Sequence, residues 1–183
     1  MSGAPVLGTF SQWRELSDNV GFVAPLHKVK EMPARVSTVS ALGVPGQRWA
    51  TIIDPRSAIA HDAVIGHGCF VGPFATVGPG ARVGCHAVVR AGAHVSHDCT
   101  VGDFAFVGTN AVVCGYAVLG EGAYLAPNAT IRDGCRVGAF SIVGLGSVVV
   151  KDVADFAVVA GAPARSTGST TGQRRGRPPS ALS

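Results

Sequence analysis

Side chains that could do chemistry recur in this sequence at intervals of eighteen residues. His97 is followed at that spacing by Gly115, Asp133 and Lys151, and Asp98 comes directly after the histidine. A histidine can serve as a general base near neutral pH, a glycine N–H can donate to a developing oxyanion, and a lysine can bind a phosphate. This spacing predicts a ligand groove if the chain returns to one corner every eighteen residues. The alternative is a row of outward turn residues without a chemical role.

The sequence has a six-residue period that does not slip over 96 residues. The first position of each unit is always aliphatic, and the fifth position is always Ala, Cys or Ser. The aliphatic positions are Ile53, Ile59, Ile65, Val71, Val77, Val83, Val89, Val95, Val101, Val107, Val113, Leu119, Leu125, Ile131, Val137 and Val143. Neither an α-helix nor a plain strand has a period of six, but a short strand followed by a turn fits it.

Three such units would close a triangular coil of eighteen residues. Stacked coils would then pair as parallel strands about 4.8 Å apart, with the aliphatic positions as ladders in the interior. The small positions would lie where the backbone bends, so Cys69, Cys99 and Cys135 are expected to be buried thiols. The sequence therefore predicts an all-β parallel helix of about five coils. One of its corners carries His61, Pro79 and the row that begins at His97.

Composition and charge exclude several functional classes. The chain has 183 residues, enough for one domain, and charged residues make up only 14% of it. The net charge of +4 includes Arg174, Arg175 and Arg177 near the end, so the body carries no basic face for a nucleic acid. The five cysteines contain no CxxC pair, which argues against a disulfide framework or a zinc ribbon.

Membrane insertion is not predicted, although the mean hydropathy is positive at +0.34. The longest run without charge, Phe104 to Gly120, has 17 residues and contains three glycines. A spanning helix needs about 20 largely apolar residues. The N-terminus has no basic segment followed by an apolar one, as a signal peptide would. We therefore expect a soluble cytoplasmic protein.

Two segments carry a resemblance to a known family. Residues 89–115, VRAGAHVSHDCTVGDFAFVGTNAVVCG, resemble the active-site segment of hexapeptide-repeat sugar acetyltransferases, the family of the sialic acid O-acetyltransferases and of the bacillosamine- and perosamine-type nucleotide-sugar N-acetyltransferases. Residues 148–165, VVVKDVADFAVVAGAPAR, resemble the closing segment of that family. The resemblance implies a left-handed β-helix that transfers an acetyl group from acetyl-CoA to a sugar amine or hydroxyl.

The resemblance also implies roles for individual residues. His97 matches the catalytic base, Asp98 the adjacent acid that supports it, and Gly115 the glycine whose amide faces the thioester oxygen. Lys151 and Arg165 match basic positions near the phosphate end of the coenzyme.

Two further residues complete the expected coenzyme site. Gly161 belongs to the matching closing segment. Asp133 either contacts coenzyme amides through water or is an exposed turn carboxylate. In the family the active sites lie between neighbouring subunits, so a homotrimer is implied.

Three positions depart from the family pattern. Arg90 stands where much of the family has Asn, Ser96 where it has an acid, and Phe106 where it has a second His. In the family these positions line the acceptor and thioester pocket, so the identity of the sugar is left open. His94 is a candidate replacement polar group, against the alternative of a solvated surface histidine.

The chain divides into three segments by this pattern. Residues 1–52 break the period, contain both tryptophans and are expected to cap the first coil. They are too short for the nucleotide-binding domain of the family. Residues 53–165 form the β-helix with a C-terminal cap that begins at Val149. Residues 166–183 are expected to be a disordered tail.

Other functions remain as alternatives. The three departures and the short N-terminal segment suit a non-catalytic β-helix that acts as a scaffold or binding subunit. A serine-type O-acetyltransferase fits less well, because those proteins have a long helical N-terminal region. No metal site is predicted, since His94 and His97 are three residues apart and no third histidine fits.

Overall fold

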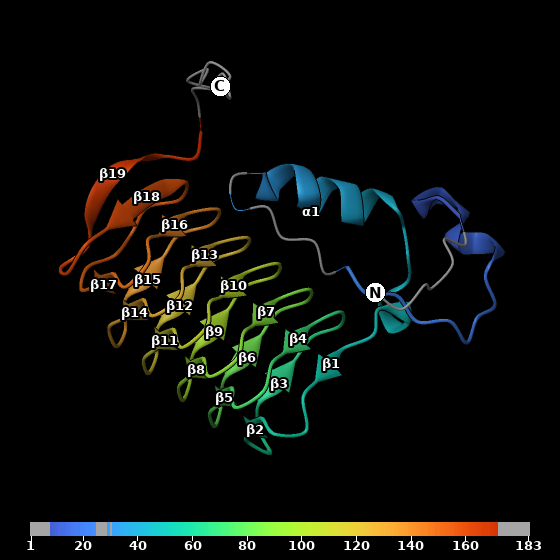
Figure 1. The fold of residues 1–183 in the computed structure, drawn as a ribbon, viewed down its shortest axis with the longest axis horizontal. Helices are drawn as coiled ribbons and strands as arrows, with labels where there is room; N and C mark the ends of the chain where they lie inside the picture. Colours follow the sequence, from blue (N-terminus) through green and yellow to red (C-terminus); the bar gives the residue numbers. More distant parts are fainter. Residues whose placement is uncertain (1–7, 25–28, 30, 172–183) are drawn as a thin grey trace, which may run out of the picture.

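The computed structural model describes residues 8–24, 29 and 31–171, and its main body is built from seventeen two-residue strands (Figure 1). They are β1 (Ile52–Ile53), β2 (Ala58–Ile59), β3 (Val64–Ile65), β4 (Phe70–Val71), β5 (Thr76–Val77), β6 (Arg82–Val83), β7 (Val88–Val89), β8 (His94–Val95), β9 (Thr100–Val101), β10 (Phe106–Val107), β11 (Val112–Val113), β12 (Val118–Leu119), β13 (Tyr124–Leu125), β14 (Thr130–Ile131), β15 (Arg136–Val137), β16 (Ile142–Val143) and β17 (Val148–Val149). Each strand ends on the aliphatic position of its six-residue unit.

The strands form three parallel sheets that wrap into a prism (Figure 1). Sheet 1 contains β1, β4, β7, β10, β13 and β16; sheet 2 contains β2, β5, β8, β11, β14 and β17; sheet 3 contains β3, β6, β9, β12 and β15. Neighbours pair eighteen residues apart, as Val88, Phe106 and Tyr124 do. The predicted parallel β-helix with an eighteen-residue coil is therefore confirmed, and seventeen strands at three per coil make nearly six coils.

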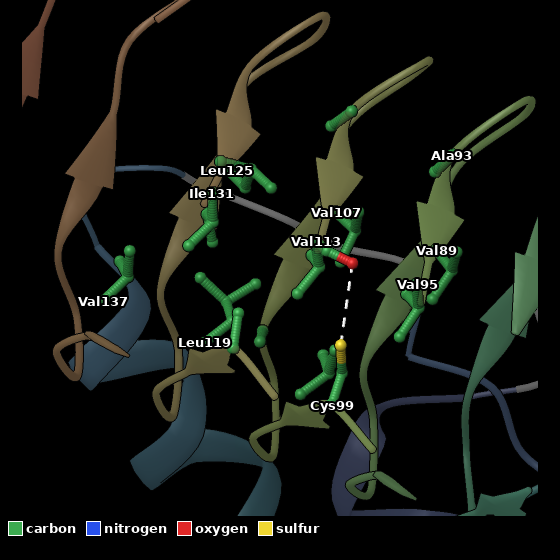
Figure 2. Packing of buried hydrophobic residues seen from close by; sticks show 14 of the residues in the cluster. Val89, Ala93, Val95, Cys99, Val107, Val113, Leu119, Leu125, Ile131 and Val137 are labelled. Atoms are coloured by element: carbon green, nitrogen blue, oxygen red, sulfur yellow. Dashed lines mark hydrogen bonds between the residues drawn. The ribbon is translucent and has the colours of Figure 1, made fainter. Parts of the chain in front are cut away.

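The interior is filled by the two inward rows of the repeat (Figure 2). The aliphatic ladder from Val71 to Val137 has exposures of 2% or less, and the alanines of the small row from Ala75 to Ala129 are fully buried. Cys69, Cys99 and Cys135 lie in the small row and are buried free thiols, as predicted. Burial raises the pKa of the Cys69 thiol to about 11.

Two corners of the prism carry the features described below. The first, here called the His97 corner, joins sheet 2 to sheet 3 through the turns at 96–99, 114–117 and 132–135. The second, the His86 corner, joins sheet 3 to sheet 1 through the turns at 84–87 and 102–105. At both corners the third turn residue has a positive φ, as in Asp98 (55°) and His86 (59°).

The N-terminal segment packs along the His86 corner instead of over the end of the first coil. It contains η1 (Phe10–Glu15), α1 (Met32–Ala41) and η2 (Gly46–Arg48). The Trp49 ring meets the His86 ring edge-on at 4.8 Å, and the Arg35 guanidinium lies 5.4 Å from the centre of the Phe104 ring. Ile52 and Ile53 of the first coil are 47% and 43% exposed, so the described N-terminal segment leaves these two side chains partly open to solvent.

The C-terminal segment continues sheet 1 beyond the prism. β18 (Ala157–Ala160) pairs with β16, and β19 (Arg165–Ser169) returns antiparallel to β18. The predicted disordered tail is wrong for residues 166–171, because their backbone pairs with β18 and Thr170 donates to the carbonyl of Phe156. Residues 172–183 lie outside the described residues. No helix in the described part of the chain has the length and apolar character needed to cross a bilayer.

Candidate active site

His97 and Asp98 form a side-chain pair on the outside of the His97 corner. The Nδ1 atom of His97 lies 3.0 Å from Oδ2 of Asp98, and both side chains are 49% exposed. A carboxylate can only accept a hydrogen bond, so the shared proton belongs to Nδ1. The Nε2 atom of the neutral ring then has a free lone pair and can accept a proton.

The ring of His97 lies against Gly115, one coil further along the prism. A Cβ atom on Gly115 would come within 2.7 Å of both Cε1 and Nε2 of His97, and within 3.3 Å of Oδ1 of Asp133. Only a glycine leaves room for this arrangement, because real Cβ contacts do not fall below 3.0 Å. The structure therefore brings together His97, Asp98, Gly115 and Asp133.

The backbone N–H of Gly115 has no hydrogen-bond acceptor within the described residues. Two turn amides at the second position of a turn elsewhere in the prism do bind an oxygen anion. The N–H of Cys85 donates to the Asp103 carboxylate at 2.7 Å, and the N–H of Ala139 donates to the Asp155 carboxylate at 2.8 Å. This type of turn amide can thus hold a negatively charged oxygen, and at Gly115 it has no acceptor and lies beside the His97 ring.

Lys151 and Arg165 meet at the C-terminal end of the same corner. Both line a cavity of about 410 Å³, together with Asp152, Ala164 and Ser166. Lys151 occupies the corner position three coils beyond His97, which corresponds to about 14 Å at the spacing of parallel strands. The two cations are exposed, and they form the positive end of the row that starts at His97.

Gly161 differs from Gly115 because its polar groups are already used. Its N–H donates to Oγ of Ser147 at 3.0 Å, and its carbonyl accepts from the N–H of Val148 at 3.0 Å. Its φ of +102° explains the need for glycine at this turn. Gly161 therefore has a structural reason to be glycine, and its assignment to the coenzyme site stays a prediction.

The three predicted acceptor residues are not all near His97. Ser96 lies in the same turn as His97 and is half-buried. Arg90 follows β7, with its guanidinium 5.7 Å from the centre of the Phe70 ring, and Phe106 lies in β10. Phe106 belongs to sheet 1 and Arg90 lies at the corner between sheets 1 and 2, whereas the His97 corner joins sheets 2 and 3. One chain alone does not bring them to His97.

One neighbour of the His97 ring, Tyr116, was not singled out from the sequence. The Tyr116 ring meets the His97 ring edge-on, with centroids 5.1 Å apart and an angle of 87°. His94 of β8 is hydrogen-bonded to Oγ1 of Thr76 on the preceding strand of sheet 2, so it is tied to the sheet surface. Only the position of Tyr116 directly after Gly115 could have suggested its contact with His97.

A larger cavity lies away from these residues. It measures about 650 Å³, lies between η1 and α1, and is lined by apolar side chains that include Trp13, Phe22 and Leu42. None of the predicted site residues borders it. The described residues also contain no group of three metal-binding side chains.

The family model that matches the chain is the bacterial transferase hexapeptide (six repeats), over residues 50–79. A comparison with curated protein sequences finds no match.

Three similar solved structures cover most of the chain. The acetyltransferase domain of PglB from Neisseria gonorrhoeae, solved with acetyl coenzyme A, is 28% identical with a TM-score of 0.80, and the match covers 91% of this chain and 80% of that one. PerB from Caulobacter crescentus, solved with CoA and GDP-perosamine, is 24% identical with a TM-score of 0.77, covering 87% and 75%. WeeI from Acinetobacter baumannii is 22% identical with a TM-score of 0.65, covering 91% and 79%. The last two support the fold alone.

These findings define the class of the protein as an acyltransferase with the hexapeptide-repeat fold. The predicted resemblance to hexapeptide-repeat sugar acetyltransferases is confirmed by the repeat match and by the 28% identical acetyltransferase domain.

Proposed function

We propose that the protein transfers an acetyl group from acetyl-CoA to an amine or hydroxyl of a nucleotide-linked sugar. The observation that carries this proposal is the His97 ring, paired with Asp98 and lying over the unpaired amide of Gly115. The acetyl coenzyme A complex of the 28% identical PglB domain supports the donor. The sugar class rests on the resemblance of residues 89–115.

His97 acts as the general base in this mechanism. Its Nε2 takes a proton from the acceptor N–H or O–H while the acceptor atom forms a bond to the thioester carbonyl carbon. The imidazolium that results is stabilised by the Asp98 carboxylate at 3.0 Å. When the C–S bond breaks, the imidazolium returns its proton to the departing thiolate, and the enzyme regains its starting state.

Gly115 stabilises the charge that develops during attack. As the carbonyl oxygen gains negative charge, the Gly115 N–H donates a hydrogen bond to it. The Gly115 N–H has no acceptor within the described residues and is therefore free to donate to this oxygen. The imidazole covers Gly115 from one side, and the acyl oxygen therefore enters beside the ring.

Lys151 and Arg165 bind the phosphate end of the coenzyme, and Asp133 and Gly161 border its path. The row from His97 to Lys151 gives the coenzyme arm a straight course along the His97 corner. Arg90, Ser96 and Phe106 are assigned to the acceptor pocket. Since Phe106 lies on sheet 1 and Arg90 at the corner between sheets 1 and 2, a neighbouring subunit of a homotrimer supplies them.

Calorimetric titration with acetyl-CoA tests the donor site first. We expect saturable binding near one site per chain. Lys151→Glu should weaken it at least tenfold, and the matched control Arg82→Glu on the face of sheet 3 should leave it unchanged. Absence of binding to the folded trimer would refute the proposal and favour a scaffold.

Acetyl transfer to a panel of nucleotide-linked amino and hydroxy sugars tests the base. We expect His97→Ala to abolish turnover while the affinity for acetyl-CoA stays within a few-fold. Equal turnover in His97→Ala would remove His97 from the mechanism.

A further inference from the structure

Tyr116 is the aromatic side chain that contacts the ring of the base. Its ring stands at 87° to the His97 ring with centroids 5.1 Å apart, and its N–H donates to the His97 carbonyl at 3.2 Å. The Tyr116 side chain is nevertheless 63% exposed. His97 is therefore bounded by Asp98 at Nδ1, by Gly115 beneath Nε2 and by the tyrosine beside the ring.

The backbone conformation of Tyr116 is unfavourable for a bulky residue. Its φ is +60°, and the left-handed region costs a residue other than glycine roughly 1–2 kcal/mol. The neighbouring coils of the His97 corner place Gly80, Asp98 and Gly134 at the same turn position, which are residues that tolerate this conformation better.

Other aromatic residues in this conformation have a partner on the face of the ring. His86 stacks on Phe104 at 4.6 Å, Phe140 stacks on Phe156 at 5.5 Å, and the Arg56 guanidinium lies 5.1 Å from the centre of the Phe74 ring. Tyr116 has no stacked partner within the described residues; its one ring contact is the edge-on contact with His97. Strain that packing does not offset is a feature of functional positions.

We propose that Tyr116 is a positioning residue for His97. The inference rests on the proposed acetyl transfer. A half-exposed histidine held by one hydrogen bond to Asp98 can swing into solvent about its side-chain torsions. The tyrosine ring blocks that movement and holds Nε2 over Gly115, where the reacting atoms meet. A displacement of about 1 Å at such a centre can cost 10²-fold in rate.

Kinetics of three variants test this role. Tyr116→Asn removes the ring but suits a positive φ, and Tyr116→Phe keeps the ring. The matched control is Phe74→Asn, because Phe74 has a φ of +59° and is 65% exposed, but lies on a different corner beside Arg56. We expect Tyr116→Asn to lower kcat at least tenfold with both KM values within twofold, while Tyr116→Phe and Phe74→Asn keep kcat within twofold of the wild type.

Several kinetic results would overturn the proposal. An unchanged kcat in Tyr116→Asn would do so, as would an equal loss in Phe74→Asn. A failure of Tyr116→Phe to keep kcat would point to chemistry at the hydroxyl. A rise in KM with kcat unchanged would make Tyr116 a substrate contact.

NMR of the His97 ring protons separates this proposal from the proposed function. The resonances are assigned by their loss in His97→Ala. We expect Tyr116→Asn to shift and narrow them as the ring becomes mobile, with no such change in Phe74→Asn. If these changes occur in a protein that transfers no acetyl group, the proposed function fails and the positioning role stands. If the resonances do not change, the positioning role fails even in an active enzyme.

Discussion

At the scale of single residues, the site depends on the absence of a side chain at Gly115. The ring of His97 occupies the space that a Cβ would need, and the Gly115 amide is the donor that the proposed mechanism uses. Steric exclusion and hydrogen bonding therefore act at one position. Any substitution there changes both the place of the base and access to the amide.

Gly115→Ala should consequently lower kcat by about 10²-fold, because the ring of His97 is displaced by an added methyl group at 2.7 Å. The control is Gly168→Ala in β19, where a Cβ would meet nothing within 4 Å. Steady-state kinetics and thermal unfolding of both variants check the prediction. Activity retained in Gly115→Ala would show that the base does not work from the observed ring position.

At this scale, the repeat determines which contacts could be predicted from the sequence. The eighteen-residue spacing predicted that His97, Gly115 and Asp133 would meet, and they do. It did not predict the contact with Tyr116, since aromatic residues also occur in turns without a site, as Phe74 does. The direction of a turn side chain depends on its rotamer, which no periodicity encodes.

At the scale of elements, the N-terminal segment depends on one buried histidine. His86 is 9% exposed, lies between Trp49 and Phe104, and its Nδ1 has no hydrogen-bond partner. Burial lowers the pKa of His86 below its usual 6.5, and Arg35 and His67 add to that effect, while Asp103 opposes it. The packing around His86 therefore favours the neutral imidazole.

This predicts that acid loosens the N-terminal segment. The unfolded state binds more protons at His86 than the folded state does, so stability contributed by neutral His86 is lost as pH falls below about 6.5. Both tryptophans belong to this segment, so their fluorescence reports on it selectively. We expect the urea concentration at the midpoint of the fluorescence transition to be lower at pH 5 than at pH 7.5.

Substitutions distinguish the acid sensitivity that comes from His86 from that of the other titratable groups. The fall should be smaller in His86→Phe and unchanged in the control His61→Asn, an exposed turn position. An equal fall in His86→Phe would assign the acid sensitivity to other groups.

The N-terminal segment is also the part of the structure that could be predicted least well from the sequence. Its residues break the six-residue period, so no pattern indicated where they lie on the prism. Their positions follow from ring contacts such as Trp49 with His86, which join residues far apart in sequence. The β-helix, by contrast, was predictable because each unit repeats the same inward rows.

At the scale of the whole molecule, the arrangement of the candidate residues bears on assembly. Arg90 and His97 lie on different corners of one chain, so a site that uses both takes them from two chains. Two variants defective at different residues should then complement each other. His97→Ala and Arg90→Glu are suitable, because both side chains are exposed and the fold does not depend on them.

Coexpression of these variants in equal amounts should restore roughly a quarter of the wild-type activity, since one site in four combines an intact His97 with an intact Arg90 from its neighbour in a cyclic oligomer. Activity of the whole coexpressed pool, purified by one tag common to both variants, provides the measurement. No recovery would place both residues in sites within one chain. Full activity of Arg90→Glu alone would remove Arg90 from the acceptor pocket.

Because the six-residue register is uninterrupted, residues on one corner are separated along the prism axis by whole numbers of coils. Insertion of six residues would turn every later face by one third of a revolution and move Lys151 to another corner. Insertion of eighteen residues between Gly115 and Asp133 would preserve every corner and lengthen the gap between base and cation by one strand spacing, about 4.8 Å. The distance between His97 and Lys151, which the coenzyme arm must span, can therefore change only by complete coils. In this chain the two residues are three coils apart.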